Sequence, residues 1–331
     1  KNNYLNLDLE IIIKKKLQWN KLNGCRILIT GGNGFLGNYI VRLLLSLNKS
    51  NKIKRPIKVV SMMRKITKSK KKQMMDILND PYLEIIEWDL NKFMIPKIGQ
   101  CDYIFHTASQ ASPKFYKLDP VGTLLPNTIG TEALLRAQYQ QTRKPKGFFY
   151  ISSGEVYGQN KNKSISEISY GSLDPASLRS CYAESKRMGE SICVAWNNQY
   201  KIPIYIARLF HTYGPGIKPD DGRVFADFAS NIIKRENIIM NSDGKQTRAF
   251  CYISDALLGI FFVLFKGKKA TPYNIGNPSA ATTIKGLAKK LVKLYPEKKI
   301  KIKKKKNRKN SKYIQSTFKN VVPNINRVKS L

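Results

Sequence analysis

The feature that most constrains the fold is a glycine-rich turn between a short apolar run and a helix-length amphipathic segment. Residues 25–30 predict a buried strand, and residues 35–47 predict a helix. The connection carries Gly31, Gly34 and Gly37 in Gly-x-x-Gly-x-x-Gly spacing. Such glycines allow a tight turn, close approach of backbone N–H groups to a pyrophosphate, and close packing of helix on strand. In this context the spacing predicts a dinucleotide site rather than an ordinary glycine-rich turn.

The alternation of strands and helices continues through the first two thirds of the chain. It predicts an α/β fold, a Rossmann-type doubly wound parallel sheet with a smaller C-terminal substrate lobe. We expect an N-terminal extension at residues 1–23, a dinucleotide-binding Rossmann domain at 24–211 and mainly a substrate-binding lobe at 212–331. Further strands are expected at 57–62, 83–87, 102–107, 147–152 and 202–209, and further helices at about 70–78, 121–141 and 180–200.

The formal net charge of +37 invites a nucleic-acid interpretation, because basic faces release counterions from phosphate backbones. The excess is mostly lysine spread along the chain, with concentrated runs at 64–72 and 298–312. Such runs are usually solvated surface, and no nucleic-acid-binding motif accompanies them. We therefore expect no nucleic-acid partner.

The cysteines and the apolar stretches indicate in which compartment the chain works and whether it associates with a membrane. Five cysteines stand singly, without the close pairs of a zinc site or a disulfide framework, so we expect no metal and a reducing cytoplasm. The longest strongly apolar stretch, residues 256–265, is about half of a membrane span. No signal-peptide pattern opens the chain, so we expect no membrane association.

Candidate catalytic side chains follow the strand expected at 147–152. Ser153 and Glu155 come just past its carboxyl end, where open α/β sheets bind ligands. In the next expected helix, Tyr182 and Lys186 are one turn apart on the same face. A lysine ammonium beside a phenol, near a positive nicotinamide ring, favours the phenolate, so we expect the pKa of Tyr182 to fall below its usual value of about 10. Tyr182 would act as general base, with Ser153 hydrogen-bonding the same substrate oxygen.

The Tyr-x-x-x-Lys spacing alone is weak evidence, because this chain contains it three times. The pair that begins at Tyr157 lies in a loop, and the pair that begins at Tyr295 is interrupted by Pro296. Only the pair that begins at Tyr182 lies on an uninterrupted helical pattern.

These motifs, in this order, resemble the extended short-chain dehydrogenase/reductases and, among them, the NAD-dependent epimerase/dehydratase family. Within that family the chain most resembles the UDP-glucuronate decarboxylases (UDP-xylose synthases). The resemblance covers nearly the whole chain, and the segment 322–331 resembles one after which family members continue. It is carried by six segments in order: 106–113 (HTASQASP), 127–131 (NTIGT), 155–158 (EVYG), 213–215 (YGP), 220–224 (DDGRV) and 244–250 (GKQTRAF).

The resemblance implies NAD as cofactor, with NADP as an alternative, a nucleotide-sugar substrate that is UDP-linked, and a homodimer. It implies that Asp89 contacts the adenine end, Arg223 the substrate phosphates and Arg248 the sugar end. The expected cofactor contacts are Gly31, Gly34, Phe35, Leu36, Gly37, Arg64, Asp89, Leu90, Thr107, Ala108, Tyr182 and Lys186. The expected substrate contacts are Ser109, Glu155, His211, Arg223, Val224 and Arg248, and the expected catalytic residues are Ser153, Glu155, Tyr182 and Lys186.

The chain departs from the family pattern at three places. Gly154 stands where these decarboxylases have serine and dTDP-glucose dehydratases have aspartate, so one acid/base group is missing. His211 stands where the family has asparagine, either as a packed histidine or as a substrate contact. The acid expected to bind the adenosine ribose is absent, since the end of the second strand offers Ser61 and Arg64.

The implied chemistry begins when Tyr182 removes the proton of the sugar 4-hydroxyl while the 4-hydride passes to the nicotinamide. If the sugar carries a carboxylate at C5, the resulting ketone is beta to it and carbon dioxide leaves. Arg248 would orient the carboxylate, and Glu155 would help to place or protonate the ring carbon. The reduced cofactor then returns its hydride.

Other reactions share the opening step. A 4,6-dehydratase needs the acid that Gly154 lacks, whereas a 4-epimerase needs only the base and leaves Glu155 and Arg248 without a role. Outside catalysis, the fold could serve as a dinucleotide sensor or a basic RNA-binding protein. The intact Ser153, Tyr182 and Lys186 favour turnover.

Overall fold

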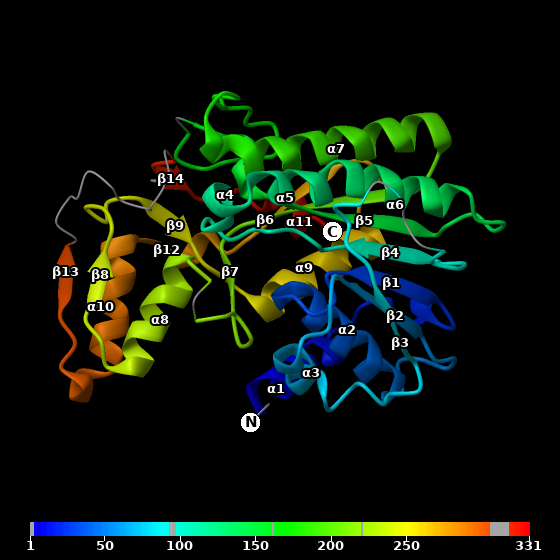
Figure 1. Ribbon diagram of the computed structural model, residues 1–331, viewed down its shortest axis with the longest axis horizontal. Helices are drawn as coiled ribbons and strands as arrows, with labels where there is room; N and C mark the ends of the chain where they lie inside the picture. The colour runs from blue at the N-terminus through cyan, green and yellow to red at the C-terminus, as the bar shows by residue number, and fades with distance from the viewer. Residues whose placement is uncertain (1–2, 93, 95–96, 161, 220, 305–317) are drawn as a thin grey trace.

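The computed structural model describes residues 3–331 except 93, 95–96, 161, 220 and 305–317. Asp220 of one matched segment and residues 305–312 of the second basic run therefore lie outside the described residues. Seven strands form a parallel sheet in the order β11-β6-β5-β4-β1-β2-β3 (Figure 1). They are β1 (Arg26–Thr30), β2 (Lys58–Met63), β3 (Leu83–Glu87), β4 (Tyr103–His106), β5 (Gly147–Ser153), β6 (Ile204–Leu209) and β11 (Pro272–Ile275).

This order confirms the predicted Rossmann-type α/β fold. Each of the six strands predicted from the sequence is present, with bounds that differ by at most two residues. The order reverses between β1 and β4, so the two halves of the sheet diverge at their carboxyl ends and leave a crevice there.

Helices cover both faces of the sheet (Figure 1). On one face, Ile27 and Ile29 of β1 pack in a core with α2 (Phe35–Asn48) and α9 (Ile253–Lys266). On the other face, Leu28 packs in a core with α6 (Ile129–Tyr139) and α7 (Cys181–Tyr200). Apolar side chains on both faces explain why the strands read as continuous apolar runs.

The single helix expected over residues 121–141 is wrong. The chain forms α5 (Pro120–Leu124), a 3-10 turn (Leu125–Asn127) and then α6. Pro126 has no N–H to donate within a helix, so the first helix ends before it. The helix expected at about 70–78 is α3 (Lys68–Met74), which begins earlier because the side chain of Thr67 accepts a hydrogen bond from the N–H of Lys70.

Both ends of the chain contribute to the region around the sheet. The apolar stretch 256–265 lies within α9, and β11 is the strand next to β6, so part of the segment assigned mainly to the substrate lobe lies with the sheet. At the other end, α1 (Asn3–Lys14) carries Asp8, whose buried carboxylate accepts hydrogen bonds from Tyr39 of α2 (3.0 Å) and Tyr252 (3.1 Å). The division into three regions stays a prediction.

A smaller group of elements lies beside the carboxyl edge of the sheet (Figure 1). Its core includes Phe228, Ile232, Ile238 and Leu287. In the described part of the chain, no helix is long and apolar enough to cross a bilayer. The remaining elements are α4 (Phe115–Leu118), β7 (Thr212–Tyr213), α8 (Val224–Lys234), β8 (Ile238–Met240), β9 (Thr247–Ala249), β10 (Cys251–Tyr252), β12 (Ala281–Thr283), α10 (Ile284–Leu294), β13 (Ile302–Lys304), β14 (Asn320–Val321) and α11 (Asn326–Lys329).

Candidate active site

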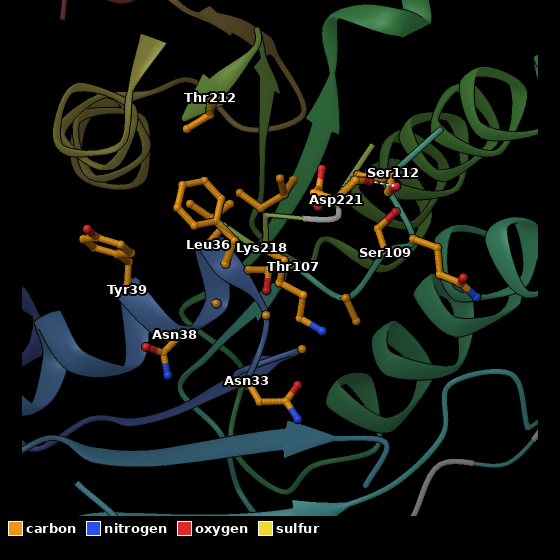
Figure 2. Close-up of a pocket in the computed structure, with 18 of the residues that line it drawn as sticks. Asn33, Leu36, Asn38, Tyr39, Thr107, Ser109, Ser112, Thr212, Lys218 and Asp221 are labelled. Carbon is orange, nitrogen blue, oxygen red and sulfur yellow. Dashed lines mark hydrogen bonds between the residues drawn. The ribbon is translucent and has the colours of Figure 1, made fainter. Parts of the chain in front are cut away.

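A cavity of about 1060 Å³ lies at the carboxyl ends of the sheet strands. Figure 2 shows Asn33 and Leu36 of the glycine-turn region on its wall together with Ser109, Ser112 and Asp221. All but one of the predicted site residues line this cavity; the exception is Val224, the first residue of α8. The lining residues are Gly31, Gly34, Phe35, Leu36, Gly37, Arg64, Asp89, Leu90, Thr107, Ala108, Ser109, Ser153, Glu155, Tyr182, Lys186, His211, Arg223 and Arg248. Their roles stay predictions.

The turn between β1 and α2 has a geometry that requires glycine. Gly31 has φ +66°, and a Cβ there would lie 2.9 Å from the Cα of Ala108. The N–H of Gly34 donates to the carbonyl of Gly31 (2.8 Å), which closes the turn. A Cβ at Gly37 would overlap that carbonyl oxygen, so helix and strand can approach only without a side chain there. The first residues of α2 line the cavity, and the free N–H groups at a helix start are where an anion can bind.

A buried hydrogen-bond network fixes the ends of β1 and β4 beside this turn. The hydroxyl of Thr30 lies 2.8 Å from Nδ1 of His106, and Nε2 of His106 lies 2.9 Å from the carbonyl of Pro126. Because a carbonyl only accepts, Nε2 carries the proton and Nδ1 accepts from Thr30. Burial lowers the pKa of His106 to about 3, so the ring stays neutral. The same Thr30 oxygen accepts from the N–H groups of Thr107 (3.2 Å) and Ala108 (3.1 Å), which holds this part of the cavity wall in place.

The candidate base lies at the start of α7. Tyr182 is buried, and its ring stacks on that of Tyr116 with centroids 5.3 Å apart and planes 13° apart. Ser153 ends β5, and its hydroxyl lies near enough to the phenol to lower the pKa of Tyr182. Lys186 is also buried; its ammonium donates to the carbonyl of Ile151 (2.7 Å) and lies 5.9 Å from the centre of the Tyr182 ring. Serine, tyrosine and lysine thus come together as predicted from their order in the chain.

The expected lowering of the Tyr182 pKa is not produced by the protein's own groups. Burial first, and then the charge of Glu155, raise the pKa of Tyr182 to about 12, and the hydroxyl of Ser153 only partly opposes this rise. Burial also lowers the pKa of Lys186 to about 7. The sequence argument considered the neighbouring ammonium but not the loss of water around both groups.

Glu155 is held by an arginine that the sequence argument missed. Arg179 donates from Nη1 and Nη2 to the two carboxylate oxygens of Glu155, at 2.8 and 2.9 Å. The two side chains are 11% and 22% exposed, so the pair is largely shielded from water. The guanidinium also lies 4.8 Å from the ring centre of Tyr116, the ring on which Tyr182 stacks. The sequence could have indicated Arg179 by its position: it stands three residues before Tyr182, about one helical turn away, and so near the candidate base.

The two arginines expected at the substrate end both have protein partners. Arg248 is buried and donates to the carbonyls of Thr247 (2.8 Å), Lys319 (3.2 Å) and Phe318 (2.9 Å). Arg223 forms an ion pair with Asp221 through Nε and Nη2. Backbone carbonyls therefore take up much of the Arg248 fork, although both arginines line the cavity.

His211 and Gly154, two departures from the family pattern, both line the cavity. His211 has φ 30°, a region in which histidine and asparagine are both enriched, so either residue fits this backbone. Its ring packs 6.0 Å from that of Phe250, and burial lowers the pKa of His211 to about 3. A Cβ at Gly154 would lie 2.8 Å from the ring of Phe210, so a side chain there requires the ring to shift. His211 both packs and lines the cavity, which leaves its two predicted roles open.

The sheet is parallel and has a glycine turn at its switch point, and a serine, a tyrosine and a lysine line the same cavity. Together these features define a dinucleotide-binding enzyme of the short-chain dehydrogenase/reductase class. In the described part of the chain, no group of three His, Cys, Asp or Glu residues could hold a metal ion. The chain belongs to the NAD dependent epimerase/dehydratase family, which it matches over residues 27–276.

Curated relatives and solved structures agree with this assignment. The chain is 36% identical to UDP-glucuronic acid decarboxylase 6 of Arabidopsis thaliana over 259 residues, 78% of this chain and 71% of that protein. It is 33% identical to UDP-glucuronic acid decarboxylase 1 of Xenopus tropicalis over 253 residues, 76% of this chain and 56% of that protein. UDP-glucuronic acid 4-epimerase from Bacillus cereus, solved with UDP-glucuronic acid and NAD, superposes with a TM-score of 0.75 at 23% identity, covering 92% of each chain. This structural likeness shows the shared fold.

Proposed function

We propose that the chain is a UDP-glucuronate decarboxylase that oxidises the sugar at C4 with a tightly held NAD, with NADP as the alternative cofactor. The observation that carries the proposal is one cavity lined by the glycine turn, by Ser153 and Tyr182, and by Arg223 and Arg248. Such a cavity can hold a dinucleotide and a nucleotide-sugar with the sugar beside the phenol. The identity to curated decarboxylases over most of the chain supports this choice of reaction.

The residues fit a nicotinamide dinucleotide. The turn at Gly31 and Gly37 has no room for a Cβ, and the backbone N–H groups at the start of α2 would hold the pyrophosphate. Lys186 and Tyr182 would hold the nicotinamide end. When bound, the cofactor supplies the hydride acceptor and a positive ring that favours the phenolate of Tyr182, against the effect of burial.

The chain's own side chains would then perform the proton transfers. Tyr182 accepts the proton of the sugar 4-hydroxyl while Ser153 hydrogen-bonds the same oxygen. Arg248 contributes positive charge at the C5 carboxylate, although its backbone hydrogen bonds leave fewer donors for the substrate. After carbon dioxide leaves, Glu155 assists protonation of the ring carbon, and Arg179 keeps that carboxylate in a fixed position.

A 4-epimerase acting on a neutral nucleotide-sugar is the second candidate. The backbone hydrogen bonds of Arg248 favour it, because a guanidinium engaged in this way binds a carboxylate less strongly. A 4,6-dehydratase is not supported, since Gly154 offers no acid and Phe210 occupies the space beside it.

We also propose a homodimer in a reducing cytoplasm. Exposed apolar side chains on α5 and α7 support a dimer through this face, among them Val121 (59% exposed) and Met188 (54% exposed). All five cysteines are free thiols, which suits a reducing compartment. Light scattering of the purified chain tests the dimer.

Incubation with a panel of UDP-, dTDP-, GDP- and CDP-sugars, followed by mass spectrometry, tests the reaction. Decarboxylation predicts loss of carbon dioxide from UDP-glucuronate with no net change in cofactor redox state. Loss of water would favour a dehydratase. A stereochemical change at C4 without mass change, detected by chromatography, would favour the epimerase. A salt-sensitive nucleic-acid gel shift without turnover on any sugar would refute the enzymatic proposal.

A further inference from the structure

Helix α1 precedes the segment that matches the family, which begins at residue 27, yet it contributes to the cavity wall. It packs against α2 and α9 (Figure 1), and its buried side chains Leu9 and Ile12 belong to the same core as those helices. Tyr4 and Leu5, near its start, line the same cavity as the glycine turn. The candidate site is therefore bounded in part by a helix that the family motifs do not include.

The carboxylate of Asp8 is the polar group in the contact between α1 and the rest of the molecule. Asp8 is 5% exposed, and its Oδ2 accepts hydrogen bonds from the hydroxyls of Tyr39 (3.0 Å) and Tyr252 (3.1 Å). In the described part of the chain, no Lys, Arg or His nitrogen lies within 4.0 Å of this carboxylate. Burial, followed by the charge of Asp8, raises the pKa of Tyr252 to about 12 and also raises that of Tyr39. Both phenols therefore stay protonated and can donate to the buried charge.

Tyr39 connects Asp8 to the glycine turn. It lies one helical turn after Phe35, the first residue of α2, and the two rings meet edge to face with centroids 6.0 Å apart and planes 81° apart. Both residues line the cavity, and Figure 2 shows Tyr39 on the same helix as Leu36. The N–H groups of this first helical turn are those that would hold the pyrophosphate. A shift of Tyr39 would therefore reach the dinucleotide through one turn of helix.

Tyr252 connects the same carboxylate to the substrate side of the cavity. It pairs with Tyr213 in the parallel strands β10 and β7, and the centroids of the two rings are 5.5 Å apart. The Tyr213 ring lies 4.2 Å from that of Phe225 in α8, the helix that begins directly after Arg223. Tyr252 itself does not line the cavity. One oxygen of Asp8 thus joins α2, on the dinucleotide side, to strands that lead to the substrate side.

Covering the core would not require a charge at this position, because apolar side chains such as Leu9 and Ile12 do that. Hydrogen bonds are directional, whereas apolar contacts are not, so a carboxylate shared by two phenols fixes the relative position of their elements. We propose that Asp8 is a positioning residue that holds α2 and the β7–β10 strand pair together, so that the crevice stays closed over a bound dinucleotide and releases it slowly. This inference rests on the proposed dinucleotide-dependent function.

The rate at which the dinucleotide leaves the full chain tests this role without turnover. The protein is loaded with labelled NAD, or with NADP if wild type prefers it, and chased with an excess of the unlabelled dinucleotide. Asp8→Leu is expected to raise the dissociation rate constant by about tenfold or more, the effect of losing a charge-assisted contact. Asp8→Asn keeps one acceptor oxygen, so a smaller increase is expected. Tyr252→Phe is expected to raise the rate constant by about threefold or more, although Tyr252 does not line the cavity.

Tyr273→Phe is the matched control. Tyr273 is also buried and outside the cavity wall, and its hydroxyl accepts one hydrogen bond, from the N–H of Lys268 (2.9 Å). Its replacement removes a buried hydroxyl without touching Asp8. The dissociation rate constant of this variant is expected to equal that of wild type.

The outcomes separate this inference from the proposed function. A wild-type dissociation rate in Asp8→Leu overturns the inference and leaves the dinucleotide-dependent function intact. If Asp8→Leu does not fold, wild-type rates in Asp8→Asn and Tyr252→Phe overturn it in the same way. An equal increase in Tyr273→Phe would assign the effect to a general loss of stability and overturn it as well. If wild type binds neither dinucleotide, the proposed function fails and the inference fails with it.

Discussion

Replacing Arg179 tests whether the ion pair with Glu155 is part of the catalytic machinery. Arg179→Gln leaves the carboxylate without its two hydrogen bonds of 2.8 and 2.9 Å. Breaking a fully buried pair costs about 3–5 kcal/mol, and an exposed pair contributes about 0–1 kcal/mol. With side chains 11% and 22% exposed, we expect a loss of about 2 kcal/mol in the free energy of unfolding.

The catalytic effect is separate from this loss of stability. A reacting group displaced by about 1 Å can lose about a hundredfold in rate, so kcat is expected to fall by about ten- to a hundredfold, with a smaller change in KM. The assay compares Arg179→Gln, Glu155→Gln and the double variant on the preferred nucleotide-sugar. If the two residues act as one unit, the double variant is no slower than the slower single variant.

The matched control is Arg136→Gln, which breaks an Arg–Glu pair on the surface of α6. Because Arg136 is exposed to solvent, that pair is expected to contribute little to stability and nothing to kcat. If the loss of kcat in the double variant equals the product of the two single losses, the claim that Arg179 positions Glu155 is refuted. A wild-type kcat in Arg179→Gln would also refute it.

The remaining predictions concern the proton acceptor, the sugar carboxylate and the pH dependence of stability. Tyr182→Phe is expected to abolish turnover with little loss of substrate binding, measured by kinetics and calorimetry; near wild-type activity would exclude Tyr182 as the base. Arg248→Ala is expected to lower kcat/KM for UDP-glucuronate by about one to two decades more than for UDP-glucose, with partial rescue by lysine. Equal losses would favour an enzyme of neutral sugars. Because the pKa of Lys186 is lowered to about 7 in the folded chain, an unfolded Lys186 binds more protons between about pH 7 and 10.5, so the contribution of Lys186 to the stability of dinucleotide-free protein is expected to rise with pH there. Chemical denaturation of Lys186→Met, compared with wild type, checks that this rise depends on Lys186.

The sequence predicted the sheet well because its signals are local. Buried parallel strands read as short apolar runs, and Gly31 is required by a backbone that can be recognised from strand, turn and helix together. The break at Pro126 was missed because the flanking residues keep a helical pattern. The return of β11 to the sheet edge was missed because strand order depends on contacts between distant segments.

The candidate site was predicted less completely, for an electrostatic reason. Spacing indicated that Ser153 and Tyr182 would meet, but not that burial would raise the pKa of the phenol. It identified Arg248 without the carbonyls of Phe318 and Lys319, just before β14, that occupy its fork. Arg179 was missed because its importance depends on which carboxylate it reaches. Shielding from water and the pairing of charges are properties of the assembled wall and are not visible in a linear pattern.

The hydrogen bonds of Asp8 have a consequence for the order in which the chain folds. One of its two partners, Tyr252, is 244 residues away, so the carboxylate can be satisfied only after most of the chain has been synthesised. Until then α1, if it docked on α2, would bury a carboxylate that has only one of its two hydrogen bonds, the one from Tyr39, which disfavours early docking. Helix α1 is therefore expected to be among the last elements to gain protection from hydrogen exchange during refolding.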